Sequence, residues 1–336
     1  MPQNAMQSAQ NAAAEFKQVF ESIRTEVGRM IVGQQEIVEG VLTALMAGGH
    51  ILLEGAPGLG KTMLVSALSK AVNMEFSRIQ FTPDMMPADI VGTSVLTETA
   101  NGGHELSFQQ GPIVSNIVLA DEINRATPKT QSALLEVMQE KQLTVGRTTL
   151  KMPEPFCVMA TQNPIDQEGT YPLPEAQLDR FLFKLVVGYP TEADYHTIID
   201  RTTSGEQIDI HPITDAATLC RLRDIVRQVP VPHAAKSYAI RLVMATQPGS
   251  DYASAAVNRY VSLGASPRGI QSLMLAAKVQ ALLHGRFAVS CDDIRRISLP
   301  VLRHRIVTNF QAQAANVDTA SIVAELLANS ALSQEL

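Results

Sequence analysis

One stretch decides the fold of this chain: Gly55-Ala56-Pro57-Gly58-Leu59-Gly60-Lys61-Thr62. It follows the short apolar run His50–Glu54 and precedes Met63–Val72, whose apolar residues recur at helical spacing. The pattern G-x-x-x-x-G-K-[ST] between a strand and a helix predicts a P-loop, whose backbone N–H groups surround phosphate oxygens. The N-terminus of the following helix adds a partial positive charge. The alternative, a glycine turn with an unrelated lysine, does not explain the strand and the helix on either side.

Short apolar runs alternate with helical stretches along the first 190 residues. The runs are His50–Glu54, Phe76–Phe81, Asn116–Ala120, Phe156–Thr161 and Phe181–Gly188. Most are continuously apolar, which is typical of strands buried on both faces of a parallel sheet. Helical stretches such as Thr130–Lys141 separate them. The alternation predicts an α/β fold, with a parallel five-stranded sheet between helices.

Two other parts of the chain differ from this pattern. Residues 1–14 are rich in Ala, Gln and Asn, so we expect a flexible N-terminus before a helix over Glu15–Met30. After Pro190 the periodicity is helical and no strand is indicated. We therefore place the α/β core at 15–190 and an all-helical domain at 191–336. Its candidate helices are Ala217–Gln228, Ala234–Thr246, Arg268–His284, Cys291–Arg305 and Val317–Ala328.

Two hairpins are predicted inside the core. The first spans about 91–110, where two strand-like runs flank the turn sequence Ala100-Asn101-Gly102-Gly103. The second spans about 142–151, around Gly146-Arg147. An ordinary nucleotide-binding core needs neither hairpin.

The composition limits the class of protein. The chain has 336 residues, 46% of them hydrophobic, and a net charge of −6. No apolar run reaches the ~20 residues that a membrane-spanning helix needs, and the N-terminus does not have the pattern of a secretory signal. We therefore expect a cytoplasmic protein without membrane insertion. The acidic balance argues against nucleic-acid binding, and the widely spaced Cys157, Cys220 and Cys291 indicate neither a zinc site nor disulfides.

Two acids end the third apolar run, at Asp121 and Glu122. Beside a P-loop, Asp121 and Thr62 are predicted to hold Mg²⁺, and Lys61 to reach the β- and γ-phosphates of ATP. Glu122 is predicted to act as the general base that polarises the attacking water. Acids also cap strand ends because water solvates them there, but next to a P-loop this pair indicates ATP hydrolysis.

Three further residues are candidates for the same reaction. Asn163 follows the fourth run and would orient the attacking water, although Asn-Pro also forms turns. Arg180 precedes the fifth run; it is either a solvated charge or an arginine finger that reaches a neighbouring subunit's γ-phosphate. Arg268 lies in the first turn of a helix with Ser266 as its N-cap, where a cation is unfavourable. We therefore predict a phosphate partner for Arg268, with a salt bridge to an acid as the alternative.

In this order and spacing the elements resemble the AAA+ ATPases, and more narrowly the MoxR family. The matching stretches are Ile31–Gln34, Gly55–Thr62, Gly111–Ile113, Leu119–Ala126, Gln131–Glu140, Ala160–Pro164, Glu175–Phe181, Gly264–Arg268 and Val301–Ile306. The resemblance implies an AAA+ P-loop core with a helical lid. It also implies that the first hairpin is the insertion in helix 2, that the second precedes sensor 1, and that Val32 and Gly33 lie near the adenine.

The resemblance also implies a residue set and a function. The catalytic candidates are Lys61, Glu122, Asn163, Arg180 and Arg268. The ATP-binding candidates are Val32, Gly33, Gly55, Ala56, Pro57, Gly58, Leu59, Gly60, Lys61, Thr62, Met63 and Asp121. Members form rings, usually hexamers, and are thought to act as chaperones in metal cofactor insertion or complex assembly. They often work with proteins that carry a von Willebrand factor A (VWA) domain.

Two alternative functions use the same ATP chemistry. A helicase-like nucleic-acid motor would use Lys141, Arg147 and Lys151 near the second hairpin, although these also suit a solvated face. A chelatase subunit would drive metal insertion into a porphyrin. The basic residues of Val301–Ile306 would contact a neighbour or the nucleotide, or form a charged surface cluster.

Overall fold

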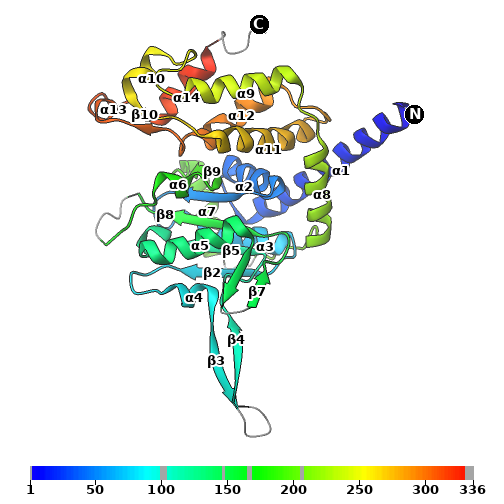
Figure 1. Ribbon diagram of the computed structural model, residues 1–336. Helices are drawn as coiled ribbons and strands as arrows, with labels where there is room; N and C mark the ends of the chain where they lie inside the picture. Colours follow the sequence, from blue (N-terminus) through cyan, green and yellow to red (C-terminus); the bar gives the residue numbers. More distant parts are fainter. Residues whose placement is uncertain (1, 99–103, 146–147, 165–168, 205–207, 330–336) are drawn as a thin grey trace.

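A computed structural model describes residues 2–98, 104–145, 148–164, 169–204 and 208–329. Figure 1 shows an α/β layer with the helical lid at one end and a projecting hairpin at the other. The elements of the first part are α1 (Pro2–Met30), α2 (Gln35–Ala47), β1 (His50–Glu54), α3 (Lys61–Ala71), β2 (Phe76–Gln80), α4 (Pro87–Val91), β3 (Gly92–Glu98), β4 (His104–Gln110), β5 (Ile117–Asp121), the 3₁₀ turn η1 (Ile123–Arg125), α5 (Pro128–Glu140), β6 (Gln142–Val145), β7 (Thr148–Lys151), β8 (Cys157–Gln162), α6 (Glu175–Leu178) and β9 (Phe181–Val186).

The five predicted strands form one sheet in the order β2-β5-β8-β1-β9, and all neighbours are parallel. The fold class predicted from the sequence is confirmed. The strand before Asn163, β8, lies between β1 and β5, as expected for a residue that must face the P-loop and the acids together. In a parallel sheet every strand ends at the same edge, so the loops after β1, β5 and β8 meet there.

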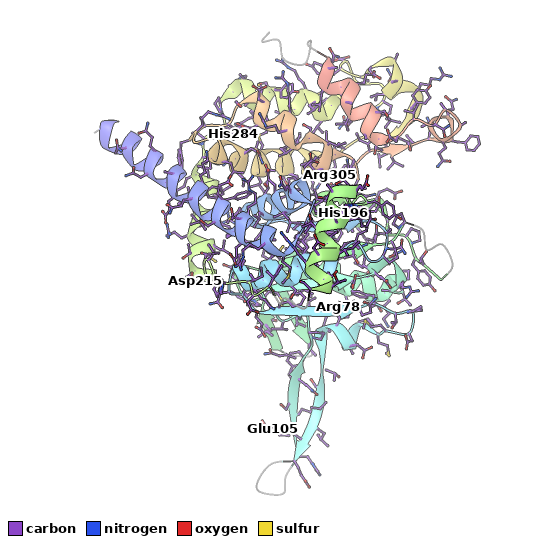
Figure 2. The ribbon with its side chains drawn as sticks, turned by 180° about the vertical axis from the view of Figure 1, so that it is seen from behind. Arg78, Glu105, His196, Asp215, His284 and Arg305 are labelled. Carbon is purple, nitrogen blue, oxygen red and sulfur yellow. The ribbon has the colours of Figure 1, made fainter. Side chains whose placement is uncertain are left out.

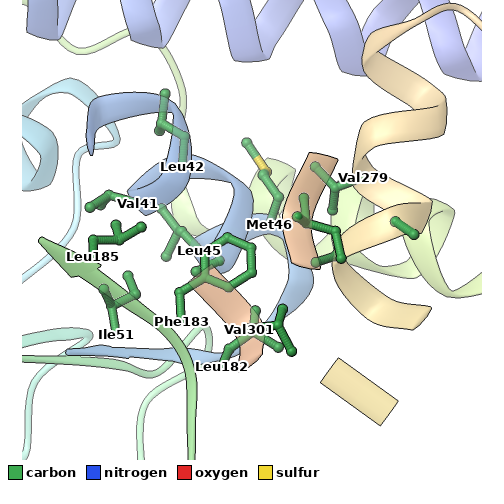
Figure 3. Packing of buried hydrophobic residues seen from close by; sticks show 14 of the residues in the cluster. Val41, Leu42, Leu45, Met46, Ile51, Leu182, Phe183, Leu185, Val279 and Val301 are labelled. Carbon is green, nitrogen blue, oxygen red and sulfur yellow. The ribbon is translucent and has the colours of Figure 1, made fainter. Parts of the chain in front are cut away.

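Alternate residues of the strands fill two apolar clusters, one on each face of the sheet. On β5, Ile117 and Leu119 join the cluster under α1, α2 and α3, whereas Val118 and Ala120 join the cluster under α5. The first cluster continues into the lid: Figure 3 shows Val279 and Val301 packed with residues of α2 and β9. Core and lid therefore share buried apolar surface, which holds them against each other.

The second part of the chain is mainly helical. Its elements are α7 (Glu192–Thr203), α8 (Ala216–Gln228), α9 (His233–Ala245), α10 (Ala255–Tyr260), β10 (Val261–Leu263), α11 (Pro267–Leu283), α12 (Cys291–Leu302), β11 (Val307–Thr308), α13 (Phe310–Ala314) and α14 (Thr319–Ala328). The five predicted helices are present, but the region is not all-helical. β10 and β11 form a short antiparallel pair that sequence periodicity does not reveal, because strands of two or three residues are too short to show a period.

The N-terminal helix is longer than predicted. It begins at Pro2 rather than Glu15, so the segment predicted to be flexible is helical in the structure. Alanine and glutamine are good helix formers and extend the helix that the buried Phe16, Phe20 and Ile23 anchor. Among the described residues, no helix is both long and apolar enough to cross a bilayer.

Both predicted hairpins are present. β3 pairs with β4 and β6 with β7, each antiparallel. Their turns, at 99–103 and 146–147, lie outside the described residues. The β3–β4 hairpin extends beyond the β2 edge of the sheet, at the end of the molecule away from the lid (Figure 1).

Candidate active site

The P-loop joins the end of β1 to the start of α3. Gly58 and Gly60 have φ values of 80° and 77°, a left-handed conformation that glycine adopts without steric cost. Gly60 directly precedes α3, so the loop ends at a helix N-terminus. Lys61 Nζ donates to the carbonyl oxygens of Gly55 at 2.5 Å and Ala56 at 3.2 Å. Partial burial lowers the pKa of Lys61, and the nearby carboxylates of Asp121 and Glu122 oppose this shift.

Asp121, the last residue of β5, is largely buried and held from both sides. Thr161 Oγ1, at the end of β8, donates to Asp121 Oδ1 at 2.6 Å. Arg78, on β2, donates to Asp121 Oδ2 from Nε at 3.1 Å and from Nη2 at 2.7 Å. Thr62 Oγ1 lies 3.5 Å from the same Oδ2 atom. Neighbouring strands therefore orient this carboxylate toward the P-loop.

Glu122 occupies a left-handed conformation, with φ 57° and ψ 48°. Such a backbone is uncommon for a residue with a side chain and persists where surrounding contacts hold it. Its N–H donates to Thr161 Oγ1 at 2.8 Å. Its carboxylate accepts a hydrogen bond from Gln80 Nε2 at 3.0 Å and pairs with Arg125 at 3.1 Å. The side chain is thus kept at the carboxyl edge of the sheet.

The P-loop, Asp121 and Glu122 line one cavity of about 380 Å³. Its lining is Pro57, Gly58, Leu59, Gly60, Lys61, Thr62, Met63, Arg78, Asp121, Glu122, Thr161 and Asn163. The predicted Lys61, Thr62, Asp121, Glu122 and Asn163 therefore meet although a hundred residues separate the first from the last. Sequence reasoning missed Arg78, Thr161 and Gln80, since a single polar residue in a strand carries no local signal; only their place on β2 and β8 identifies them.

A second, more apolar cavity of about 580 Å³ shares Pro57–Gly60 and Met63 with the first. Its other lining residues are Met30, Ile31, Val32, Gln34, Tyr189, Pro190, Tyr195, Ile198, Arg201, Thr202 and Ile208. Its size and apolar lining suit a planar base. Gln34 Nε2 donates to Leu59 O at 2.9 Å and so ties this wall to the P-loop.

Of the two residues expected near the adenine, only Val32 lines the apolar cavity. Gly33 is not among the lining residues, and a Cβ there would lie 2.3 Å from the Asp194 side chain. It allows the chain to pass close to the start of α7. That helix, which the periodicity did not reveal, supplies Tyr195 and Ile198 to the cavity.

Arg180 and Arg268 lie at the opposite edge of the sheet. In the parallel register His50, the first residue of β1, pairs with Phe181, the residue after Arg180. The two ends of β1, His50 and Glu54, lie about 13 Å apart at ~3.3 Å per residue, and the P-loop follows Glu54. Arg180 and Arg268 instead line a separate cavity of about 240 Å³ together with His50. The structure therefore places Arg268 beside Arg180, where Ser266 links the start of α11 to Asp179, and away from its own chain's P-loop.

Comparison with known proteins places this geometry. Residues 50–183 match the family model "ATPase family associated with various cellular activities (AAA)", and residues 253–326 match "AAA lid domain". The chain is 44% identical to Chaperone MoxR1 of Mycobacterium tuberculosis, over 97% of this chain and 85% of that protein. It is 29% identical to Protein MoxR of Methylorubrum extorquens, over 94% and 93%. The chain belongs to the MoxR family of AAA ATPases.

A solved structure supports the same placement of this MoxR-family chain. The crystal structure of a Cytophaga hutchinsonii protein assigned as an ATPase superposes with a TM-score of 0.88 at 37% identity, covering 96% of this chain and 97% of that one. The match includes core and lid together. The family accounts for an ATP-binding site at the P-loop cavity.

The P-loop cavity of this MoxR-family chain also fits Mg²⁺, the metal predicted from the sequence. The Thr62 hydroxyl and the Asp121 carboxylate converge within 3.5 Å, and hard oxygen atoms of this kind are what Mg²⁺ binds. Among the described residues, no group of three or more His, Cys, Asp and Glu side chains is arranged to hold another metal.

Proposed function

We propose that this chain hydrolyses ATP in a ring whose nucleotide sites lie between subunits. The observation that carries the proposal is the division of its candidate residues between two edges of one sheet. Lys61, Glu122 and Asn163 meet at the carboxyl edge, and Arg180 and Arg268 meet at the amino edge. A head-to-tail contact between copies would bring one edge to the other, and repetition of that contact closes a ring such as a hexamer.

Each residue has a physical role in this proposal. Lys61 and the P-loop N–H groups bind the phosphates, and the apolar cavity beside Val32 takes the adenine. Thr62 and Asp121 would hold Mg²⁺, which neutralises charge between the β- and γ-phosphates when it is bound. Glu122 takes the proton of the attacking water, which Asn163 orients. Arg180 and Arg268 of the neighbour stabilise the negative charge of the transition state.

Mixed rings test this proposal. We expect Glu122→Gln to bind ATP but to lose on the order of 10² or more of its turnover, because general-base catalysis contributes this much. A ring of Arg180→Ala should lose turnover as well, because no subunit then supplies the arginine to its neighbour's nucleotide. Mixed together, the two variants should recover part of the activity, because some interfaces then combine an intact Glu122 with an intact Arg180.

The control is a mixture of Arg180→Ala with Arg268→Ala, in which every subunit presents an incomplete arginine pair. It should stay as slow as its components. Lack of recovery with Glu122→Gln at every mixing ratio would show that Arg180 does not act on a neighbour's nucleotide.

The output we propose is remodelling of protein clients in the cytoplasm. The relative Chaperone MoxR1 is named for such a role, and the β3–β4 hairpin presents Leu96 and Leu106 opposite each other with 64% and 70% of their surfaces exposed. Metal cofactor insertion or complex assembly with a VWA-domain partner is the specific form we propose. Glu122→Gln loaded with ATP should retain a protein client on purification. Nanomolar binding to DNA at physiological salt would favour a nucleic-acid motor instead.

A further inference from the structure

A run of basic residues follows α12, and none of them is among the residues that line the two nucleotide cavities. From the sequence we expect Arg303, His304 and Arg305 to form a charged surface cluster or to contact the nucleotide or a neighbouring subunit. In the structure His304 and Arg305 are buried, and only 1% of the Arg305 side chain is exposed. Figure 2 shows Arg305 between the lid and the core. A buried guanidinium is costly unless its donors find partners, so its contacts indicate its purpose.

Those contacts surround Arg180 in the chain. Arg305 Nε donates to Asp179 Oδ1 at 2.7 Å, and Nη2 donates to the carbonyl oxygens of Phe181 at 2.7 Å and Asp179 at 3.2 Å. Nη1 donates to the carbonyl oxygen of Leu182 at 3.2 Å. One rigid, planar group thus fixes the backbone on both sides of Arg180.

The same group also reaches the start of the helix that carries Arg268. The second oxygen of Asp179, Oδ2, accepts a hydrogen bond from Ser266 Oγ at 2.7 Å. Ser266 is the N-cap of α11, and its Oγ accepts from the N–H of Arg268 at 3.1 Å. Arg305 Nη2 donates to Ser272 Oγ, one turn further along α11, at 3.0 Å. The Arg305–Asp179 pair therefore binds both segments into one unit.

We infer that Arg305 is a positioning residue that sets the relative placement of Arg180 and Arg268 for the nucleotide of the neighbouring subunit. This inference rests on the proposed function. Arg305 does not itself touch the nucleotide. Its importance follows from the sensitivity of transition-state contacts to distance, since a displacement of about 1 Å can cost roughly 10²-fold in rate.

The test replaces Arg305 in the full chain and measures turnover and nucleotide affinity separately. Arg305→Gln should lower kcat at least tenfold and change the Kd for ATP less than threefold, because the P-loop lies at the other edge of the sheet. Mixed with Glu122→Gln, it should recover activity, because Glu122→Gln presents a correctly placed arginine pair. Mixed with Arg180→Ala it should not, because both subunits then present a defective pair.

The matched control is Arg286→Gln. Arg286 also forms an ion pair within the lid, at 2.6 Å to the buried Asp293, and its side chain donates to Asp293 and Ala288 O rather than to the segments around Arg180 and Arg268. It should leave kcat within twofold of the wild type. If Arg305→Gln does not fold, two milder variants replace it. Arg305→Lys keeps the charge and loses the planar fork, and Ser266→Gly removes the hydrogen bond to Asp179. Both should lower kcat by a smaller factor, with the same pattern of rescue.

Two results would overturn the inference. One is a folded Arg305 variant with kcat near the wild-type value. The other is a loss of turnover in Arg305→Gln that mixing with Glu122→Gln does not restore, although the same mixing restores Arg180→Ala. The substitution would then have damaged the subunit's own nucleotide site. If Arg180→Ala is not rescued either, the intersubunit site itself is refuted, and with it any arginine pair for Arg305 to place.

Discussion

Glu122 illustrates how neighbouring side chains hold a reactive residue in place. Its left-handed backbone is unfavourable by itself, and the hydrogen bond from its N–H to Thr161 helps to fix it. Gln80 and Arg125 then hold the carboxylate. Gln80 lies outside the motif that revealed Glu122 and reaches it because β2 pairs with β5, whereas Arg125 belongs to the motif and is turned back toward Glu122 by the 3₁₀ turn η1.

His50 determines part of the acid stability. It is buried, accepts a hydrogen bond from the N–H of Val158 at its Nδ1, and contacts Met138 O through Nε2 at 3.0 Å. Burial lowers the pKa of His50 to about 4 from 6.5. The unfolded chain therefore binds the proton more tightly, and the contribution of His50 is complete above pH 6.5 and lost as the pH falls toward 4. At ~1.4 kcal/mol per pKa unit, this amounts to roughly 3 kcal/mol.

Urea unfolding at pH 7, 6, 5 and 4 measures this effect. We expect His50→Asn to unfold more easily at pH 7 and to show a weaker dependence on pH than the wild type. The buried His304, whose pKa is also lowered by burial, keeps part of the slope. Equal slopes in variant and wild type would remove His50 from the explanation.

Among the elements, α1 shows how tertiary contacts decide what a helix contributes. Its apolar stripe, Phe16, Phe20, Ile23 and Val27, is fully buried against the core, and α1 contacts both α3 and α11. The sequence predicted this stripe because apolar residues at helical spacing must face a core. It did not show that the same stripe also supports the lid.

Phe16→Ala should therefore destabilise the whole chain. Truncating a fully buried phenylalanine costs about 3–5 kcal/mol, from lost burial and the cavity left behind. The midpoint of urea unfolding reports the change. Lys17→Ala, on the exposed side of the same helix, is the control and should stay within about 0.5 kcal/mol of the wild type. A similar loss for both variants would contradict the view that packing of the apolar stripe is what α1 contributes, because alanine is a better helix former than either residue it replaces.

At the scale of the molecule, the parallel sheet separates two groups of residues that act on one substrate. The P-loop and acids follow strand ends, and Arg180 precedes a strand. No rearrangement of side chains joins the two edges within one chain. The site that we propose therefore exists only where two copies meet.

Turnover per subunit should then depend on protein concentration. Dilution below the dissociation constant of the ring should lower specific activity, while ATP binding per subunit changes little because the P-loop cavity belongs to one chain. Activity at serial dilutions, with the oligomeric state measured by light scattering, tests this. Constant specific activity in a monomeric sample would contradict an intersubunit site.

The sequence by itself determined the local chemistry and the class of fold. The P-loop, Asp121 with Glu122, and the five strands were predicted within a few residues, because each depends on backbone conformation or burial that neighbouring residues encode. Tertiary structure alone decided which distant residues meet. In the folded chain Arg78 and Thr161 donate hydrogen bonds to Asp121, and β10 pairs with β11. Arg268 lies away from its own P-loop, and Arg305 is buried beside the backbone of Arg180. These contacts join segments that lie far apart in the chain, and spacing along a sequence carries no information about such distances until the sheet and the lid have packed.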